Sequence, residues 1–474
     1  MGGAPLRSKG CNTCRKRKVK QAVRHQSLTR PSAIFNGPNA PVVSEEATTA
    51  RDTKERAGVI NVNSQIRSQL FSLFIDSYIP SPPVGHINLR CQKVTNVIED
   101  FPSLMDGKNS QLFDRAISAL AAAFVGKKFN DSRLTHHGVK LYNHAIQAFA
   151  ALIPRTGLPV QEVLCANVVF QLYEVINCTY GFAGWMAHMQ GANAVLALHE
   201  KSLKRDQLST MLLRQLKLSN IFHAIGKSQS ALSSFPMWKM LSPPRVDDPL
   251  DEIIDILMEC TALLEKAGSV QTTQDLTNTK YLCHELEWQA HSWHTRLTNV
   301  SECPLYTLVP DDSGIPRPKT RNAVFPERFD FISVDIAEAY MLYWTALLVI
   351  SSVLYEFECQ TILHQGVIVS SHHVADSQNE YTSFFHEALF YADQLCRGVG
   401  YFIQPHMHIL GGHNLLFPVA MSSQFFHRNG FYDRYDWCQD VFATLESMGL
   451  GLASVLQGTP WLTYKSGESE NSPC

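Results

Sequence analysis

The chain has 474 residues, of which 45% are hydrophobic and 18% are charged, so it is long and apolar enough for a large buried core. Nine of its 41 Lys and Arg residues and none of its 43 Asp and Glu residues lie within residues 1–30, and the remainder carries a net charge of −11. The negative charge of residues 31–474 excludes a polyanion as their main partner. The positive charge of the first 30 residues favours a polyanion as a partner for that segment only.

The first notable pattern is a Cys-x2-Cys pair, Cys11 and Cys14, followed by dense positive charge. Two thiolates at this spacing can converge on one metal ion from a tight turn, and a basic helical turn behind them would face phosphate groups. The positive residues, named here the basic cluster, are Arg15, Lys16, Arg17, Lys18 and Lys20. The cysteine pair by itself is only half of a zinc site.

The run from Arg7 to Lys20 resembles the start of the fungal six-cysteine binuclear zinc cluster transcription factors. That family reads Cys-x2-Cys-Arg-x-Arg-Lys-x-Lys-Cys and continues to three more cysteines. Here Gln21 stands at the third cysteine position, and His25 is the only nearby replacement ligand before Cys91. With two of six ligands present, we expect a metal-free arm that is disordered in isolation, and adventitious or intermolecular zinc is the alternative.

The resemblance implies that Lys18 reads the bases of a CGG-type half-site and that Arg15, Arg17 and Lys20 contact phosphate. That readout needs a helix held by zinc in the major groove. Without the second half of the module, salt-sensitive attraction to DNA could remain while sequence selectivity is lost. The basic cluster also fits a nuclear localisation signal, which needs only an extended basic peptide.

The chain divides into three predicted parts. Residues 1–30 form the basic arm with its truncated zinc cluster motif, and residues 31–65 form a flexible linker rich in Pro, Gly, Ser, Thr and charge. Residues 66–474 form a helical body, because apolar residues recur there at helical spacing and strand-like alternation is scarce. We therefore predict an all-α fold, with a large helical regulatory domain behind a disordered basic arm.

Four groups of apolar residues at helical spacing predict four helices in the first half of the body. The groups are Ala116, Leu120 and Phe124; Leu141, Ala145, Ala148, Phe149 and Leu152; Leu164, Val168, Leu172, Val175 and Ile176; and Trp185, Met189, Ala192 and Leu196. Prolines then break the pattern, first at Pro243, Pro244 and Pro249. A second proline-rich stretch, Cys303–Phe329, predicts a long exposed loop between two helical halves.

Three further helices are expected in the second half, over Ala337–Glu358, about Tyr381–Val399 and Asp433–Val455. The first contains an apolar run, Ala339–Tyr355, that is at the short end for a membrane span. It carries Thr and Ser and is flanked by acidic residues, which favours a buried core helix. No apolar signal-peptide region follows the first residue, so we expect neither secretion nor a membrane partner.

Three segments of the body resemble landmarks of the fungal-specific regulatory domain that accompanies these zinc clusters. They are Leu172–His199, Ala339–Ser352 and Gly411–Ser423. The resemblance implies pathway-specific transcriptional regulation in the nucleus, often of a secondary-metabolite gene cluster. The alternative is an interaction or effector-sensing protein that has lost DNA recognition and dimerises with intact relatives.

Enzymatic and metal-binding patterns are weak in the body. We find no nucleophile elbow, phosphate loop or His-Glu-x-x-His helix, and Gly449 to Ser454 fits a helix ending better than a dinucleotide fingerprint. The histidines His406, His408, His413, His291 and His294 fit surface or capping roles better than metal ligation. The aromatic residues around Tyr340, Tyr343, Trp344 and Phe385 fit a core, and the cysteines fit reduced, mostly buried thiols.

We therefore predict a regulator without enzymatic activity. Its expected partners are DNA, a nuclear import receptor, a second copy or a related regulator, and a small-molecule effector held in an internal cavity of the helical body. DNA recognition is expected to be impaired or to depend on a partner, since Cys11 and Cys14 alone do not complete the zinc cluster.

Overall fold

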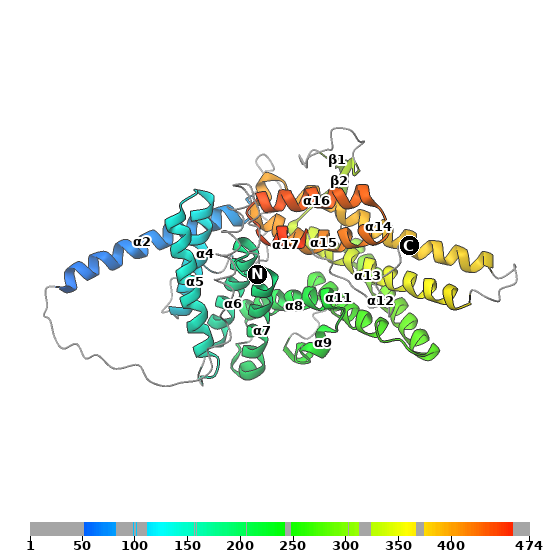
Figure 1. The fold of residues 1–474 in the computed structure, drawn as a ribbon, viewed down its shortest axis with the longest axis horizontal. Coiled ribbons are helices and arrows are strands. Elements are labelled where there is room, and N and C mark those ends of the chain that lie inside the picture. Colours follow the sequence, from blue (N-terminus) through cyan, green and yellow to red (C-terminus); the bar gives the residue numbers. More distant parts are fainter. Residues whose placement is uncertain are drawn as a thin grey trace, which may run out of the picture. The chain divides into compact units, whose positions relative to one another are not determined.

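The computed structural model of the chain (Figure 1) describes residues 52–81, 98, 101, 111–155, 157, 159–204, 206–241, 248–301, 303–311, 324–365 and 374–457. Among these residues, 82% are helical, and the strands form one two-stranded sheet. The predicted all-α fold is therefore confirmed. The chain divides into two units, 1–61 and 62–474, and the first is described only over the opening turns of one helix.

The described helices and strands come in this order along the chain. They are α2 (Asp52–Tyr78), α4 (Gln111–Lys128), α5 (Ser132–Leu152), α6 (Val160–Asn177), α7 (Gly181–His199), η2 (Glu200–Ser202), α8 (Gln207–Lys227), α9 (Ala231–Ser234), α10 (Trp238–Leu241), α11 (Pro249–Ala267), α12 (Thr273–Val300), β1 (Tyr306–Pro310), β2 (Glu327–Phe331), α13 (Val334–Gln365), α14 (Val374–Phe402), η3 (Pro405–Met407), α15 (His408–Arg428), α16 (Tyr432–Ser447) and α17 (Leu452–Leu456).

Helix α2 corrects the predicted boundary of the linker. It begins at Asp52, so the last part of the segment 31–65 is helical, while residues 31–51 lie outside the described residues. The composition of this segment suggested a linker, but its three prolines, Pro31, Pro38 and Pro41, all precede Asp52. The far end of the same helix is anchored in the core by Phe74 and Tyr78, which are fully buried, and a helix nucleated there can extend toward its N-terminus.

The four helices predicted in the first half are confirmed as α4, α5, α6 and α7. Helix α4 packs against α5 and α6, and its alanines allow close contact. A methyl group at Gly138 of α5 would lie 2.6 Å from the backbone nitrogen of Ala123, so only glycine fits at this crossing. Asp131 caps α5 by accepting hydrogen bonds from the backbone N–H groups of Arg133 and Leu134.

Helix α13 lies at the centre of the second half, where it packs against α11, α12 and α14. Its apolar segment, Val334–Cys359, is long enough to cross a membrane by length and composition alone, but 83% of that segment is buried inside the protein. Tyr340, Tyr343 and Trp344 are buried there as well, which confirms the prediction of a core helix with core aromatic residues.

The segment 303–329 differs from the predicted exposed loop, of which residues 302 and 312–323 lie outside the described residues. Strands β1 and β2 pair antiparallel in its described parts, with Tyr306 opposite Phe331 and Leu308 opposite Phe329. Phe329 and Phe331 are buried against α13, since their rings contact Trp344. The prolines stop a helix but do not prevent edge pairing, and the aromatic residues gain burial.

Helix α15 was not predicted, because Gly411, Gly412 and Pro418 fall within it. The terminal predicted helix, Asp433–Val455, is instead two helices, α16 and α17, separated at Gly449, which has φ +102°. Gly449 thus ends a helix, as the sequence indicated.

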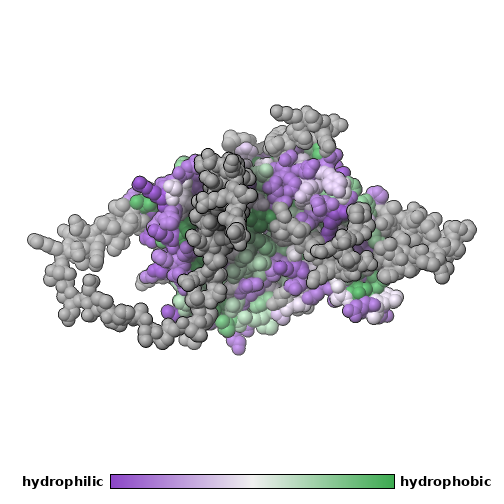
Figure 2. All heavy atoms as spheres, viewed as in Figure 1, coloured by the Kyte–Doolittle hydropathy of each residue, from purple (hydrophilic) through white to green (hydrophobic). Residues whose placement is uncertain are grey.

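On the face shown in Figure 2, the described surface is largely hydrophilic.

Candidate functional site

The site residues predicted from the sequence, Cys11, Cys14 and the whole basic cluster, lie outside the described residues. Within the described ranges, no group of three or more His, Cys, Asp or Glu side chains is arranged to hold a metal ion. The candidate sites in the described part of the body are therefore its pockets.

The histidines weighed as metal ligands each contact a tyrosine or serine. His291 Nδ1 lies 3.0 Å from the hydroxyl oxygen of Tyr343, and His294 Nε2 lies 3.1 Å from that of Tyr340. His408 Nε2 lies 3.1 Å from Ser81 Oγ. Such pairs fix the orientation of helices α12 and α13 and of the start of α15 rather than converging on one point.

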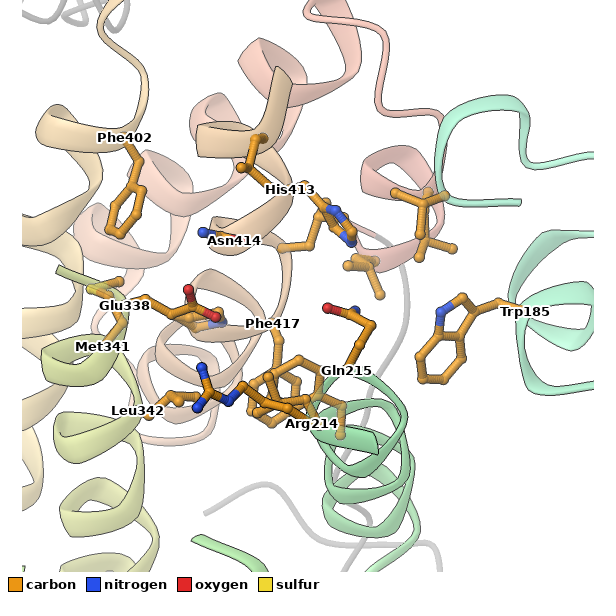
Figure 3. Close-up of a pocket in the computed structure, with 18 of the residues that line it drawn as sticks. Trp185, Arg214, Gln215, Glu338, Met341, Leu342, Phe402, His413, Asn414 and Phe417 are labelled. Carbon is orange, nitrogen blue, oxygen red and sulfur yellow. The ribbon is translucent and has the colours of Figure 1, made fainter. Parts of the chain in front are cut away.

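An apolar cavity of about 110 Å³ lies where helices from both halves meet (Figure 3). Helices α6, α7 and α8 line it from the first half, and α11, α13, α14, α15 and α17 line it from the second half. Its walls are mainly large apolar side chains. Phe222 and Phe417 stack with ring centroids 3.9 Å apart, and Phe182 and Trp185 stack at 5.3 Å.

Glu338 is the acidic group of this cavity. It lies near the start of α13, and its carboxyl group faces the cavity (Figure 3). Its pKa is raised to about 7, mainly by burial and also by nearby Asp335, whereas Arg214 acts to lower it. Among the described residues the carboxyl group has no hydrogen-bond partner. An acid in such an environment is close to half protonated at neutral pH.

Arg214 is the basic group of the cavity, and its guanidinium group is already paired with two aspartates. Its Nε donates to Asp251 Oδ1 at 2.6 Å, and its other guanidinium nitrogen donates to Asp248. Asp248 also caps helix α11, accepting a hydrogen bond from the backbone N–H of Leu250 at 3.0 Å. The two aspartates therefore hold the guanidinium group in place beside the cavity and offset its charge.

His413 and two amide side chains complete the polar lining. His413 Nδ1 lies 2.7 Å from the hydroxyl oxygen of the fully buried Tyr78. Burial lowers the pKa of His413 to about 4, so its imidazole is neutral at physiological pH. Gln215 and Asn414 also line the cavity (Figure 3), and their amides can donate or accept hydrogen bonds.

A second group of buried polar side chains lies in the first half of the body, where it joins helices by hydrogen bonds. Tyr142 on α5 places its hydroxyl oxygen 2.5 Å from Glu174 Oε1 on α6 and 2.6 Å from His188 Nε2 on α7. Tyr180 donates its backbone N–H to the other carboxylate oxygen of Glu174. These bonds link the three helices α5, α6 and α7. They account for Glu174 and His188 within the segment 172–199.

The arrangement of the cavity suits the binding of a small molecule. An enclosed apolar space with a few convergent polar groups is the usual form of a ligand site, because apolar contact supplies affinity and the polar groups fix orientation. Sequence reasoning missed Arg214, Gln215 and Asn414, and it treated Glu338 only as a flank of an apolar helix. A charged residue near the start of an otherwise apolar buried helix is the signal that could have identified Glu338.

Comparison with known proteins gives no relative for this chain: no protein-family model, no curated protein and no solved structure matches it.

Proposed function

We propose that this chain is a nuclear transcription regulator whose helical body binds a small-molecule effector. The observation that carries the proposal is the union of two features in one chain. The basic cluster follows Cys11 and Cys14 in the pattern of a zinc cluster factor, and the body holds a largely apolar pocket of about 110 Å³. The first feature supports nuclear import and contact with nucleic acid, and the second supports control by an effector.

Gln21 favours a second candidate function for the arm. Because the arm alone cannot complete the zinc cluster, DNA recognition is impaired or comes through a partner. The alternative is then an interaction or effector-sensing protein that dimerises with intact relatives. Both candidates keep the same effector site, and they differ in whether the purified chain alone selects a DNA sequence.

A localisation and occupancy experiment tests the proposal. The full chain, fluorescently tagged in its native host, should accumulate in the nucleus, and deletion of its gene should change the transcripts of a limited set of genes. Chromatin immunoprecipitation should place the tagged chain at those genes. A chain that stays in the cytoplasm, with unchanged transcripts after deletion, would contradict the proposal.

A gel-shift experiment separates the two candidates. Purified full-length protein is given a CGG-containing duplex and a scrambled duplex of equal length. Indifference to sequence, together with occupancy in cells, indicates recognition through a partner. A preference of about a hundredfold or more for the CGG duplex, on the order of specific recognition, indicates that the chain reads DNA by itself.

A further inference from the structure

The charges around the cavity do not balance. Arg214 is paired with Asp248 and Asp251, and Lys217, the next basic residue on α8, is paired with Asp255. Both of these basic residues are therefore paired with aspartates, and neither serves Glu338 alone as a counter-ion. A carboxylate in a largely apolar pocket is costly when the nearby guanidinium group is already paired with two aspartates, and a bound cation would reduce that cost.

The walls of the cavity also suit a positive charge. Phe222 and Phe417 stack on one another at the lining, and Trp185 lies at another side of it (Figure 3). Aromatic faces attract an ammonium group electrostatically when water is excluded. His413 does not oppose a cation, since its imidazole is neutral, and Asn414 offers an amide oxygen as an additional acceptor.

The volume limits the size of the occupant. A dry apolar cavity of about 150 Å³ holds a benzene molecule. The pocket here, at about 110 Å³, is of the same order and is partly open, so it fits one ring with a one-carbon polar substituent or a short branched alkyl group. A larger molecule would require the side chains lining α13 and α15 to move.

We propose that the cavity binds a small apolar organic amine as its ammonium ion, with the Glu338 carboxylate as counter-ion and the aromatic walls around the apolar part. This proposal deepens the proposed function and rests on its premise that the cavity is an effector site. A carboxylate ligand would face the negative charge of Glu338. A neutral alcohol would leave that charge uncompensated and would bind only by apolar contact and a hydrogen bond.

Isothermal titration calorimetry on the purified full chain tests the proposal with three probes of one shape: benzylamine, benzyl alcohol and benzoate. Wild-type protein should bind benzylamine at least about tenfold more tightly than benzyl alcohol, since a hydrogen bond to a charged group is stronger than a neutral one. Benzoate should be the weakest of the three. Benzylamine should also raise the thermal unfolding midpoint more than benzyl alcohol does.

Two substitutions on the same helix locate the effect. Glu338→Gln should reduce the preference for benzylamine over benzyl alcohol to less than about threefold while keeping the affinity for benzyl alcohol. Glu356→Gln is the matched control: it makes the same chemical change on α13, about 27 Å along the helix axis, in a different pocket. It should retain the full preference.

Each other outcome overturns the proposal. Benzyl alcohol or benzoate binding as tightly as benzylamine would show that the cavity does not select a cation. A preference that survives Glu338→Gln would place the amine elsewhere. If Glu338→Gln fails to fold, the three-probe series on wild-type protein still decides. Binding of benzyl alcohol alone would refute the amine and leave the effector cavity intact, whereas binding of none of the three would remove this cavity from the proposed function.

Discussion

The carboxyl group of Glu338 should make the stability of the protein depend on pH. Its pKa is raised from 4.5 to about 7 in the folded protein, chiefly by burial. The folded state therefore holds this proton more tightly than the unfolded chain does. The resulting stabilisation is fully present below pH 4.5 and is lost as the pH rises through about 7.

The magnitude follows from the size of the shift. A difference of one pKa unit corresponds to 1.36 kcal/mol, so the contribution of Glu338 to the free energy of unfolding should fall by about 3 kcal/mol between about pH 4 and about pH 8. His188 and His413 act in the opposite sense. Burial lowers the pKa of each to about 4, so their contribution is present above pH 6.5 and is lost as the pH falls toward 4.

The variant Glu338→Gln isolates the Glu338 contribution, because both histidines remain in it. Urea unfolding followed by far-UV circular dichroism gives the free energy of unfolding of the wild type and the variant across the pH range. The wild type should lose about 3 kcal/mol relative to the variant as the pH rises from about 4 to about 8. Glu446→Gln, a change at an exposed position on α16, should differ from wild type by less than about 0.5 kcal/mol throughout.

Two results would refute this reasoning. A constant difference between wild type and Glu338→Gln at every pH would mean that folding does not shift the pKa of Glu338, because Arg214 offsets the effect of burial in spite of the two aspartates. A difference that grows in favour of the wild type as the pH rises would reverse the sign of the shift. In either case the cavity would lack an uncompensated acid, and the proposed ammonium ligand would lose its main support.

Three further predictions concern the packing of the body and the role of the arm. Tyr142→Phe removes two buried hydrogen bonds and should lower the free energy of unfolding by about 2–4 kcal/mol in urea titrations, whereas Tyr180→Phe, at an exposed tyrosine, should cost less than about 0.5 kcal/mol. Gly411→Ala places a methyl group 2.0 Å from a backbone oxygen and should lower the free energy of unfolding by about 3 kcal/mol in the same titrations, while Gly268→Ala, with nothing closer than 3.6 Å, should be tolerated. Neutralising all five residues of the basic cluster should abolish nuclear accumulation of the tagged full chain in microscopy, and unchanged accumulation would contradict an import role.

The helices that the sequence predicted are those whose burial follows from local spacing. In α6, Leu164, Val168 and Leu172 recur every four residues and all are buried, as are most other residues of this helix, so its apolar spacing alone is enough to predict a buried helix. The same holds for the apolar segment of α13. Such elements need no information from the rest of the chain beyond the presence of a core.

The elements that the sequence did not predict depend on distant partners. Strand β1 forms only because residues 327–331 pair with it, and neither strand is long enough to show a clear alternation. Helix α15 contains Pro418, which costs a backbone hydrogen bond in the helix interior. Its dense burial, from Leu415 through Ala420, offsets that cost, and burial of this kind is visible only once the neighbouring helices are in place.

The cavity illustrates the same limit for a functional site. Its lining runs from Val175 to Leu456 along the chain, and no two of its polar groups lie on one helix except Arg214 with Gln215 and His413 with Asn414. Each is unremarkable in its own segment. Only the packing of α8, α13 and α15 brings these polar groups around one cavity, so no local sequence motif could have predicted the cavity.

The position of Glu338 gives a physical reason to expect control by a ligand rather than a purely structural role. A glutamine or leucine at this position would avoid the cost of burying an acid. Without a ligand, the folded protein is therefore less stable at neutral pH than it would be with either of those residues. A bound cation removes that cost at a point where α8 and α13 meet. Ligand present at about a hundred times its dissociation constant would stabilise the body by about 2.7 kcal/mol. Any surface whose order depends on the packing of these helices would then respond to the ligand without touching it.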